Sequence, residues 1–144
     1  MTDEPPYLVR IGQLQEEVGK LLYYSLPERG WDTCTLEYRK AGPVGESLIT
    51  CTFSDGRSES LEVPMAIIRA LKELRHEMAS QGKGAWLSSS VTVNHSGHMK
   101  FAFNYDERPT WLAPVDDDVY VDDLKKYPRP PEAIPGWYRE LIGK

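Results

Sequence analysis

Hydrophobic residues recur at helical spacing in two segments of the chain. In the first segment, residues 7–26, the apolar positions are Ile11, Leu14, Val18, Leu21 and Leu22. Spacing of three and four residues is typical of an amphipathic helix. Residues 64–81 repeat the pattern, between Pro64 at a first helical turn and Gly82 after the helix end. We therefore predict two long helices, of which the first contains one destabilising glycine, Gly19, and ends at Pro27.

Strands are predicted where apolar and polar residues alternate or where a short apolar run follows a turn. These segments are residues 33–39, 48–53, 59–63, 86–94 and 98–105. The first two place Cys34 and Cys51 on their inward faces. Asp55-Gly56 between two strands predicts a hairpin with a type I′ turn. Residues 94–97 form the next predicted turn.

The predicted order is helix, three strands, helix, two strands and a short C-terminal helix over residues 137–142. Short hairpins require antiparallel pairing, so we expect an α+β fold. It would be a bent antiparallel sheet of about five strands with helices packed on one face. We predict a single domain over residues 1–144, frayed at residues 1–6, with an acidic and proline-rich loop region over residues 106–136. Within it, the prolines favour an ordered strap docked by Trp137 and Leu141, and an SH3-type polyproline ligand is the alternative.

Composition excludes several classes of protein. The formal net charge is −5 and the pI is near 5.2, which argues against binding to nucleic acid or to an anionic lipid surface. No apolar run reaches the roughly 20 residues of a membrane span. Residues 1–6 have neither a basic nor an apolar signal-peptide region, so we expect a cytoplasmic protein. Cys34 and Cys51 are accordingly interpreted as reduced core residues, and a disulfide is possible only if their strands pair in register.

Seven of the 22 acidic residues gather in one stretch, residues 104–124, against a single base, Arg108. Aromatic residues interrupt the acids, unlike in a solvating acidic tail. We expect a surface that binds a basic protein partner, with the aromatic residues as anchors. Its predicted binding residues are Asp106, Glu107, Trp111, Asp116, Asp117, Asp118, Tyr120, Asp122 and Asp123. For Asp106 the alternative is a structural role, pairing with Arg108 or capping the loop, and a plain solvated loop is the alternative for the whole stretch.

Candidate catalytic and metal-binding residues are few. His95 and His98 flank a turn and are interpreted as a polar hairpin tip, because a metal site needs more ligands. Residues 88–90 are three serines in a strand, without the strained elbow of a serine hydrolase. The aspartates lack the alternate spacing and central glycine of a calcium loop. We expect no enzyme, no metal and no cofactor. An enzyme using paired carboxylates stays open, and a strongly displaced carboxyl pKa would reveal it.

Several strings resemble the YezG-like family of bacterial immunity proteins, the antitoxins of polymorphic toxins. They are FNYDERPTW at residues 103–111, Tyr120, DLKKYPR at residues 123–129 and IPGW at residues 134–137. Leu74-Arg75 with Met78, and GAW at residues 84–86, add to the resemblance. The similarity covers the second half of the chain well and the first half only in its order of elements.

The resemblance implies a non-catalytic inhibitor that binds and neutralises a cognate toxin domain. Such toxins often act on nucleic acid and have basic grooves, which agrees with the acidic stretch. An acidic inhibitor can cover such a groove and speed association. The alternative is a regulatory or scaffold module that binds a host protein.

Overall fold

The computed structural model describes residues 5–143. Its helices are α1 (Tyr7–Ser25), α2 (Met65–Ala79), α3 (Asp118–Lys126), the 3-10 helix η1 (Pro131–Ala133) and α4 (Gly136–Ile142). Its strands are β1 (Trp31–Ala41), β2 (Val44–Phe53), β3 (Ser58–Leu61), β4 (Ser88–Asn94) and β5 (Met99–Asn104). The α+β class and the order of helices and strands are confirmed, with α3 as an addition.

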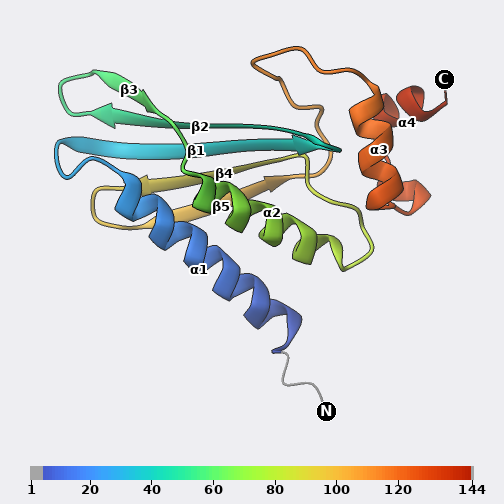
Figure 1. Ribbon diagram of the computed structural model, residues 1–144, viewed down its shortest axis with the longest axis horizontal. Coiled ribbons are helices and arrows are strands. Elements are labelled where there is room, and N and C mark those ends of the chain that lie inside the picture. The colour runs from blue at the N-terminus through green and yellow to red at the C-terminus, as the bar shows by residue number, and fades with distance from the viewer. Residues whose placement is uncertain (1–4, 144) are drawn as a thin grey trace.

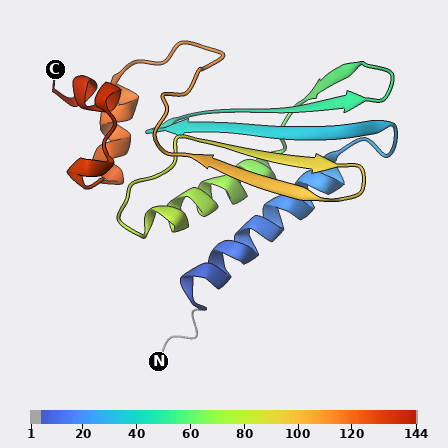
Figure 2. The ribbon, with the colours of Figure 1, turned by 180° about the vertical axis from the view of Figure 1, so that it is seen from behind.

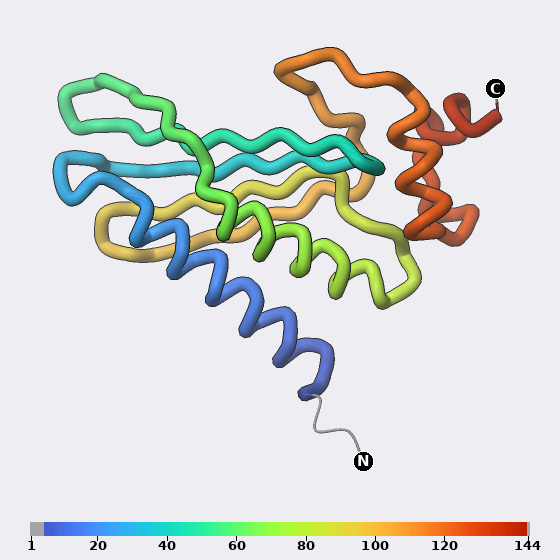
Figure 3. Tube along the Cα trace, in the orientation of Figure 1, coloured from blue at the N-terminus to red at the C-terminus, as the bar shows by residue number. Residues whose placement is uncertain are grey.

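The five strands form one antiparallel sheet in the order β3-β2-β1-β4-β5. Helix α2 carries the chain from the β3 edge to β4, across one face of the sheet (Figure 1). Helix α1 lies beside α2 on that same face, and the reverse view agrees (Figure 2). The opposite face carries no helix among the described residues. The loop between β5 and α3 rises on that side, at the sheet end nearest α3 (Figure 3).

The main core lies between the sheet and these two helices. Inward residues of β1, such as Leu36, are fully buried against Val18 and Leu22 of α1 and Leu71 of α2. Gly19 contributes through its lack of a side chain. A Cβ at this position would lie 2.7 Å from the Met99 sulfur, so glycine allows α1 to approach β5 closely.

Both predicted hairpin turns form, although the type I′ geometry is wrong. Gly56 has φ 90°, and no residue other than glycine has a positive φ within residues 5–143. Asp55 therefore does not adopt the first left-handed position of a type I′ turn. The Gly56 N–H instead donates to Phe53 O at 2.9 Å, which is the pattern of a type I turn closed by a left-handed glycine. Gly97 repeats this arrangement in the β4–β5 hairpin.

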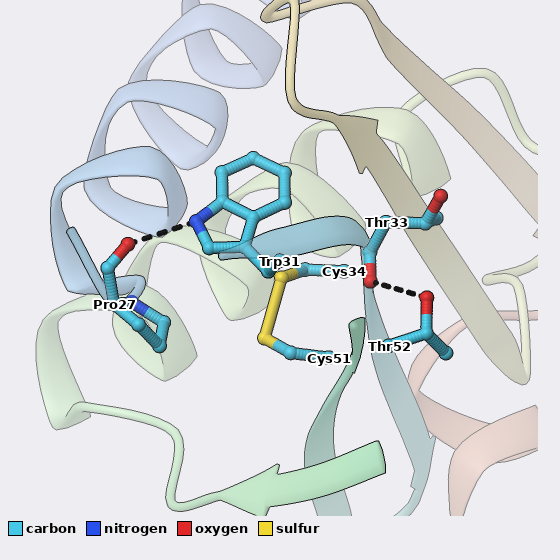
Figure 4. The surroundings of a disulfide bond; sticks show 6 residues. All are labelled: Pro27, Trp31, Thr33, Cys34, Cys51 and Thr52. Carbon is cyan, nitrogen blue, oxygen red and sulfur yellow. Dashed lines mark hydrogen bonds between the residues drawn. A yellow bond between two sulfur atoms is a disulfide. The ribbon is translucent and has the colours of Figure 1, made fainter. Parts of the chain in front are cut away.

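Cys34 and Cys51 are directly opposite each other in the β1–β2 register, and a disulfide joins them (Figure 4). The prediction of core positions is confirmed, since both residues are fully buried, but the prediction of reduced thiols is wrong. Reduced thiols were expected from the compartment, whereas the strand register brings the two sulfur atoms together. Trp31 caps this end of the core, and its indole N–H donates to Pro27 O at 2.8 Å.

A second hydrophobic cluster lies at the other end of the sheet. Its buried members are Ala41, Leu87, Val119, Tyr120, Tyr138 and Leu141. Helices α3 and α4 cover this sheet end and pack against each other (Figure 1). The predicted docking of the proline-rich strap by Leu141 is confirmed, and Trp137 packs against the same cluster.

The prediction of a loop over residues 106–136 is wrong where α3 forms. The high aspartate content favoured a loop. However, Val119 and Tyr120 precede Asp123 and Leu124 by one helical turn, and the side chains of Val119 and Tyr120 pack in the second cluster. Asp118 in the first turn and Lys125 in the last turn also complement the helix dipole. That charge order is the sequence signal that would have identified the helix.

The N-terminal prediction of fraying over residues 1–6 falls mostly outside the described residues. Pro5 and Pro6 are described, and both are held by Arg10. The Arg10 guanidinium donates to Pro5 O at 2.9 Å, and the Arg10 backbone N–H donates to Pro6 O at 3.0 Å. Among the described helices, none combines the length and apolar character needed to cross a membrane.

Candidate functional site

The predicted binding stretch forms a loop over residues 105–117 followed by α3. We call this segment, residues 105–126, the acidic arm. Asn104 shapes its start, because its side-chain oxygen accepts hydrogen bonds from the backbone N–H groups of Asp106 and Glu107 at 3.2 and 2.9 Å. The Asn104 amide nitrogen also donates to Glu107 O at 2.8 Å. One side chain at the end of β5 therefore determines the direction of the loop.

Glu46 of β2 attaches the middle of the loop to the sheet. Its two carboxylate oxygens accept hydrogen bonds from the backbone N–H groups of Leu112 and Ala113, each at 2.8 Å. Arg39 of β1 lies 3.8 Å from the same carboxylate. A carboxylate held in this way makes charge-assisted hydrogen bonds. The loop is therefore a fixed part of the surface.

Five of the predicted acids are exposed and have no ion pair within residues 5–143. They are Asp106, Glu107, Asp116, Asp118 and Asp122. Asp117 is exposed as well, but Arg108 donates to its carboxylate at 2.9 Å. The suggested pairing of Asp106 with Arg108 is therefore wrong. Asp106 has a structural contact of another kind, since its backbone oxygen accepts the Trp137 indole N–H at 2.8 Å.

Asp123 is not available to a partner, which corrects its prediction as a binding residue. It is only 3% exposed, and Arg75 of α2, also buried, donates to its Oδ2 at 2.8 Å. Its Oδ1 accepts the Gly42 N–H at 3.0 Å. The carboxylate thus joins α3, α2 and the β1–β2 turn. The linear sequence does not distinguish it from Asp122, because burial depends on which side of α3 meets the protein.

Of the two predicted aromatic anchors, Tyr120 is not available to a partner, whereas Trp111 stays partly exposed. Tyr120 is fully buried in the second cluster, and Trp111 packs against it. The Trp111 indole N–H donates to the Tyr120 hydroxyl at 2.8 Å, and the Tyr138 hydroxyl donates to Tyr120 O at 2.6 Å. Burial raises the pKa of Tyr138 well above its usual value. Hydrophobic packing at the sheet end removes the Tyr120 and Tyr138 rings from solvent.

Leu112 is the exposed apolar residue that the sequence interpretation missed. It is 69% exposed, at the point where Glu46 holds the loop. Ala113 and Pro114 beside it are exposed too. A hydrophobic residue directly before an alanine and a proline, between two groups of acids, was the available signal. Exposed apolar residues surrounded by charge are typical of the centre and rim of protein interfaces.

A polar pocket of about 340 Å³ lies under the loop on the open face of the sheet. Arg39, Ser88, Asn104, Glu107 and Arg108 are among its lining residues. One guanidinium nitrogen of Arg39 is buried here without a hydrogen-bond partner among the described residues. A concave surface with one guanidinium nitrogen that lacks a hydrogen bond therefore lies beside the exposed acids of the acidic arm.

The part of the chain that the structure describes contains no cluster of potential metal ligands. In residues 5–143, no three His, Cys, Asp or Glu side chains lie close enough to hold a metal ion. His98 contacts Ser96 at 3.2 Å in the β4–β5 turn, while His95 is exposed beside it.

No protein-family model and no curated protein matches the chain. The resemblance to the YezG-like family therefore rests on the sequence strings alone.

Proposed function

We propose that this protein is a non-catalytic immunity protein that binds and neutralises a basic toxin domain through the acidic arm. The observation that carries the proposal is the exposed Leu112, held by Glu46 and placed between exposed acids on both sides. An apolar anchor surrounded by charge can bury its surface against a partner while the charges steer the approach.

The acids divide into two groups along the acidic arm. Asp116, Asp118 and Asp122 lie on or beside the first turns of α3, and Asp106 and Glu107 lie near the start of the loop. Because these acids are exposed, removing the charge of any one of them should change the association rate more than the dissociation rate. Leu112 should act on the dissociation rate, because buried apolar contact is lost when the complex separates.

The test begins with capture of the partner from a lysate of the source strain at low and at moderate salt. The bait is the wild-type protein, and mass spectrometry identifies what it retains. Recovery of one basic toxin domain, weakened by salt, would support the proposal and supply the partner. A partner of another kind, retained equally at both salt concentrations, would favour the regulatory or scaffold alternative.

Two variants then test the acidic arm against the purified partner. The first is Asp116→Asn/Asp118→Asn/Asp122→Asn, for which we expect slower association and a weaker dependence on salt. Its matched control changes the same charge elsewhere, at three exposed glutamates without ion pairs in the described chain: Glu17→Gln/Glu28→Gln/Glu62→Gln. Equal effects of the two triple variants would reject the acidic arm as the interface. The second variant, Leu112→Ser, should accelerate dissociation about tenfold or more.

The proposed site of action is the cytoplasm. Disulfides seldom persist in that compartment, so the Cys34–Cys51 bond counts against the cytoplasm and calls for a direct test. Thiols of the protein can be trapped by alkylation in acid-quenched cells and counted by intact mass. Two alkyl groups would support the cytoplasm, and none would indicate an oxidising compartment.

A further inference from the structure

A cationic pocket lies between α2, the end of β1 and the last turn of α3, where the acidic arm ends. It has a volume of about 410 Å³. Lys40 comes from β1, Lys72 from α2 and Lys126 from the last turn of α3. These lysines are far apart in the sequence, and the packing of α3 on the second cluster brings them together. In a protein of net charge −5, such a group of bases is unexpected.

The three lysines form no ion pair with any of the described residues. Arg75 and Asp123 also line the pocket, but they are buried and form an ion pair with each other. Glu73 also lines the pocket, but no carboxylate within residues 5–143 lies at ion-pair distance from Lys40, Lys72 or Lys126. The Lys40 ammonium instead donates a hydrogen bond to Gly42 O at 2.7 Å.

The surroundings of Lys40 disfavour its charged form. Burial lowers its pKa below the usual lysine value, and the charges of Lys72, Arg75 and Lys126 lower it further. Asp123 opposes the shift. Like charges that share a partly buried site repel each other, and a bound anion would remove that repulsion.

Tyr127 forms one wall and organises the remaining bases. Its ring lies 5.5 Å from the Arg75 guanidinium carbon and 5.5 Å from the Lys126 ammonium. The His76 Nδ1 lies 2.9 Å from the Tyr127 hydroxyl. Cations are attracted to an aromatic face, so Tyr127 helps to position Arg75 and Lys126 in the pocket.

We propose that this pocket binds a phosphate group, as free phosphate or as the phosphate of a nucleotide. A phosphate monoester carries between one and two negative charges at pH 7, which suits several convergent lysines better than a single carboxylate does. Lysine ammonium groups bind phosphate as point charges, without the planar geometry that arginine requires. The inference goes beyond the proposed immunity function and does not depend on it.

The test measures binding of sodium phosphate and of ADP to the isolated wild-type protein by NMR titration, at constant ionic strength. Saturable shifts of the Gly42 amide and of the Tyr127 ring are expected. Tighter binding of ADP than of phosphate would identify a nucleotide site, and equal or weaker binding of ADP would identify a site for free phosphate. Acetate at the same concentration should cause no saturable shift.

Lys72→Ala and Lys126→Ala should each weaken phosphate binding about tenfold, the expected loss of one hydrogen bond to a charged group. Lys125→Ala is the matched control, because Lys125 is exposed, adjacent to Lys126 and outside the pocket. The proposal is overturned if phosphate gives no saturable shift, or if Lys125→Ala weakens binding as much as Lys126→Ala does.

Discussion

The Arg75 guanidinium lies 2.8 Å from the Asp123 carboxylate, and both side chains are buried. Arg75 also donates to Trp86 O at 2.6 Å and to Lys40 O at 3.1 Å. The pair therefore connects α2, β1, the segment before β4 and α3. Together with the second hydrophobic cluster, this ion pair holds α3 against the rest of the protein.

Asp123→Ala should destabilise the protein by about 3–5 kcal/mol, because Arg75 would remain buried without its counter-charge. Asp122→Ala is the control, since its carboxylate is exposed on the same helix and should change stability by about 0.5 kcal/mol or less. Urea unfolding of both variants measures the difference. Equal unfolding midpoints would contradict the structural role of the pair.

The Tyr38 hydroxyl is buried and has no hydrogen-bond partner among the described residues. Tyr38→Phe should therefore stabilise the protein at pH 7 by about 1 kcal/mol, because it removes an unsatisfied polar group. Tyr120→Phe is the contrasting variant, since it removes a hydroxyl that accepts the Trp111 N–H. It should cost about 1 kcal/mol. A loss of stability in Tyr38→Phe would contradict the prediction.

Stability should also fall at high pH on account of Tyr38. Burial raises the pKa of Tyr38 to about 12, whereas the unfolded chain releases this proton near the ordinary tyrosine pKa of 10.0. The folded protein binds more protons than the unfolded chain between these values. The free energy of unfolding is therefore unaffected by the ionisation of Tyr38 below pH 10 and falls progressively up to about pH 12. The loss amounts to about 3 kcal/mol. Unfolding free energies of wild type and Tyr38→Phe should diverge across this range, and parallel curves would reject the assignment.

Glu46→Ala should release the loop of the acidic arm. The backbone N–H groups of Leu112 and Ala113 would lose a charged acceptor, which is worth about 1.5–3 kcal/mol. Their hydrogen exchange should accelerate about tenfold or more. Glu37→Ala is the control, because Glu37 also lies 3.7 Å from Arg39 but accepts neither amide. Unchanged exchange at Leu112 in Glu46→Ala would show that the loop is held by other contacts.

Two glycines of α1 should respond in opposite ways to alanine. A Cβ added at Gly12 would meet only open space, so Gly12→Ala should stabilise the protein by about 0.5–1 kcal/mol through helix propensity. Gly19→Ala would meet the Met99 sulfur, and the overpacking cost of about 1–3 kcal/mol should exceed that gain. Thermal unfolding of the two variants provides the test. A stabilising effect in both would mean that Met99 moves away at little cost.

The pattern of apolar residues by itself determined the two long helices, the five strands and their order along the chain. These elements depend on local periodicity and on turn residues, such as Gly56 and Gly97, whose conformational requirements are local. Even there, the turn type required the structure, because Asp55 can adopt either sign of φ.

Tertiary structure alone decided which members of the acidic stretch are available for binding. The sequence identified a concentration of acid and aromatic residues, but it could not separate Asp122 from Asp123 or reveal that Tyr120 is buried. Those distinctions depend on which side of α3 packs against the sheet end, and therefore on contacts with Arg75 and Gly42, distant in the chain. The Cys34–Cys51 bond and the lysine pocket arise for the same physical reason: strand register and helix packing place residues together that no local pattern relates.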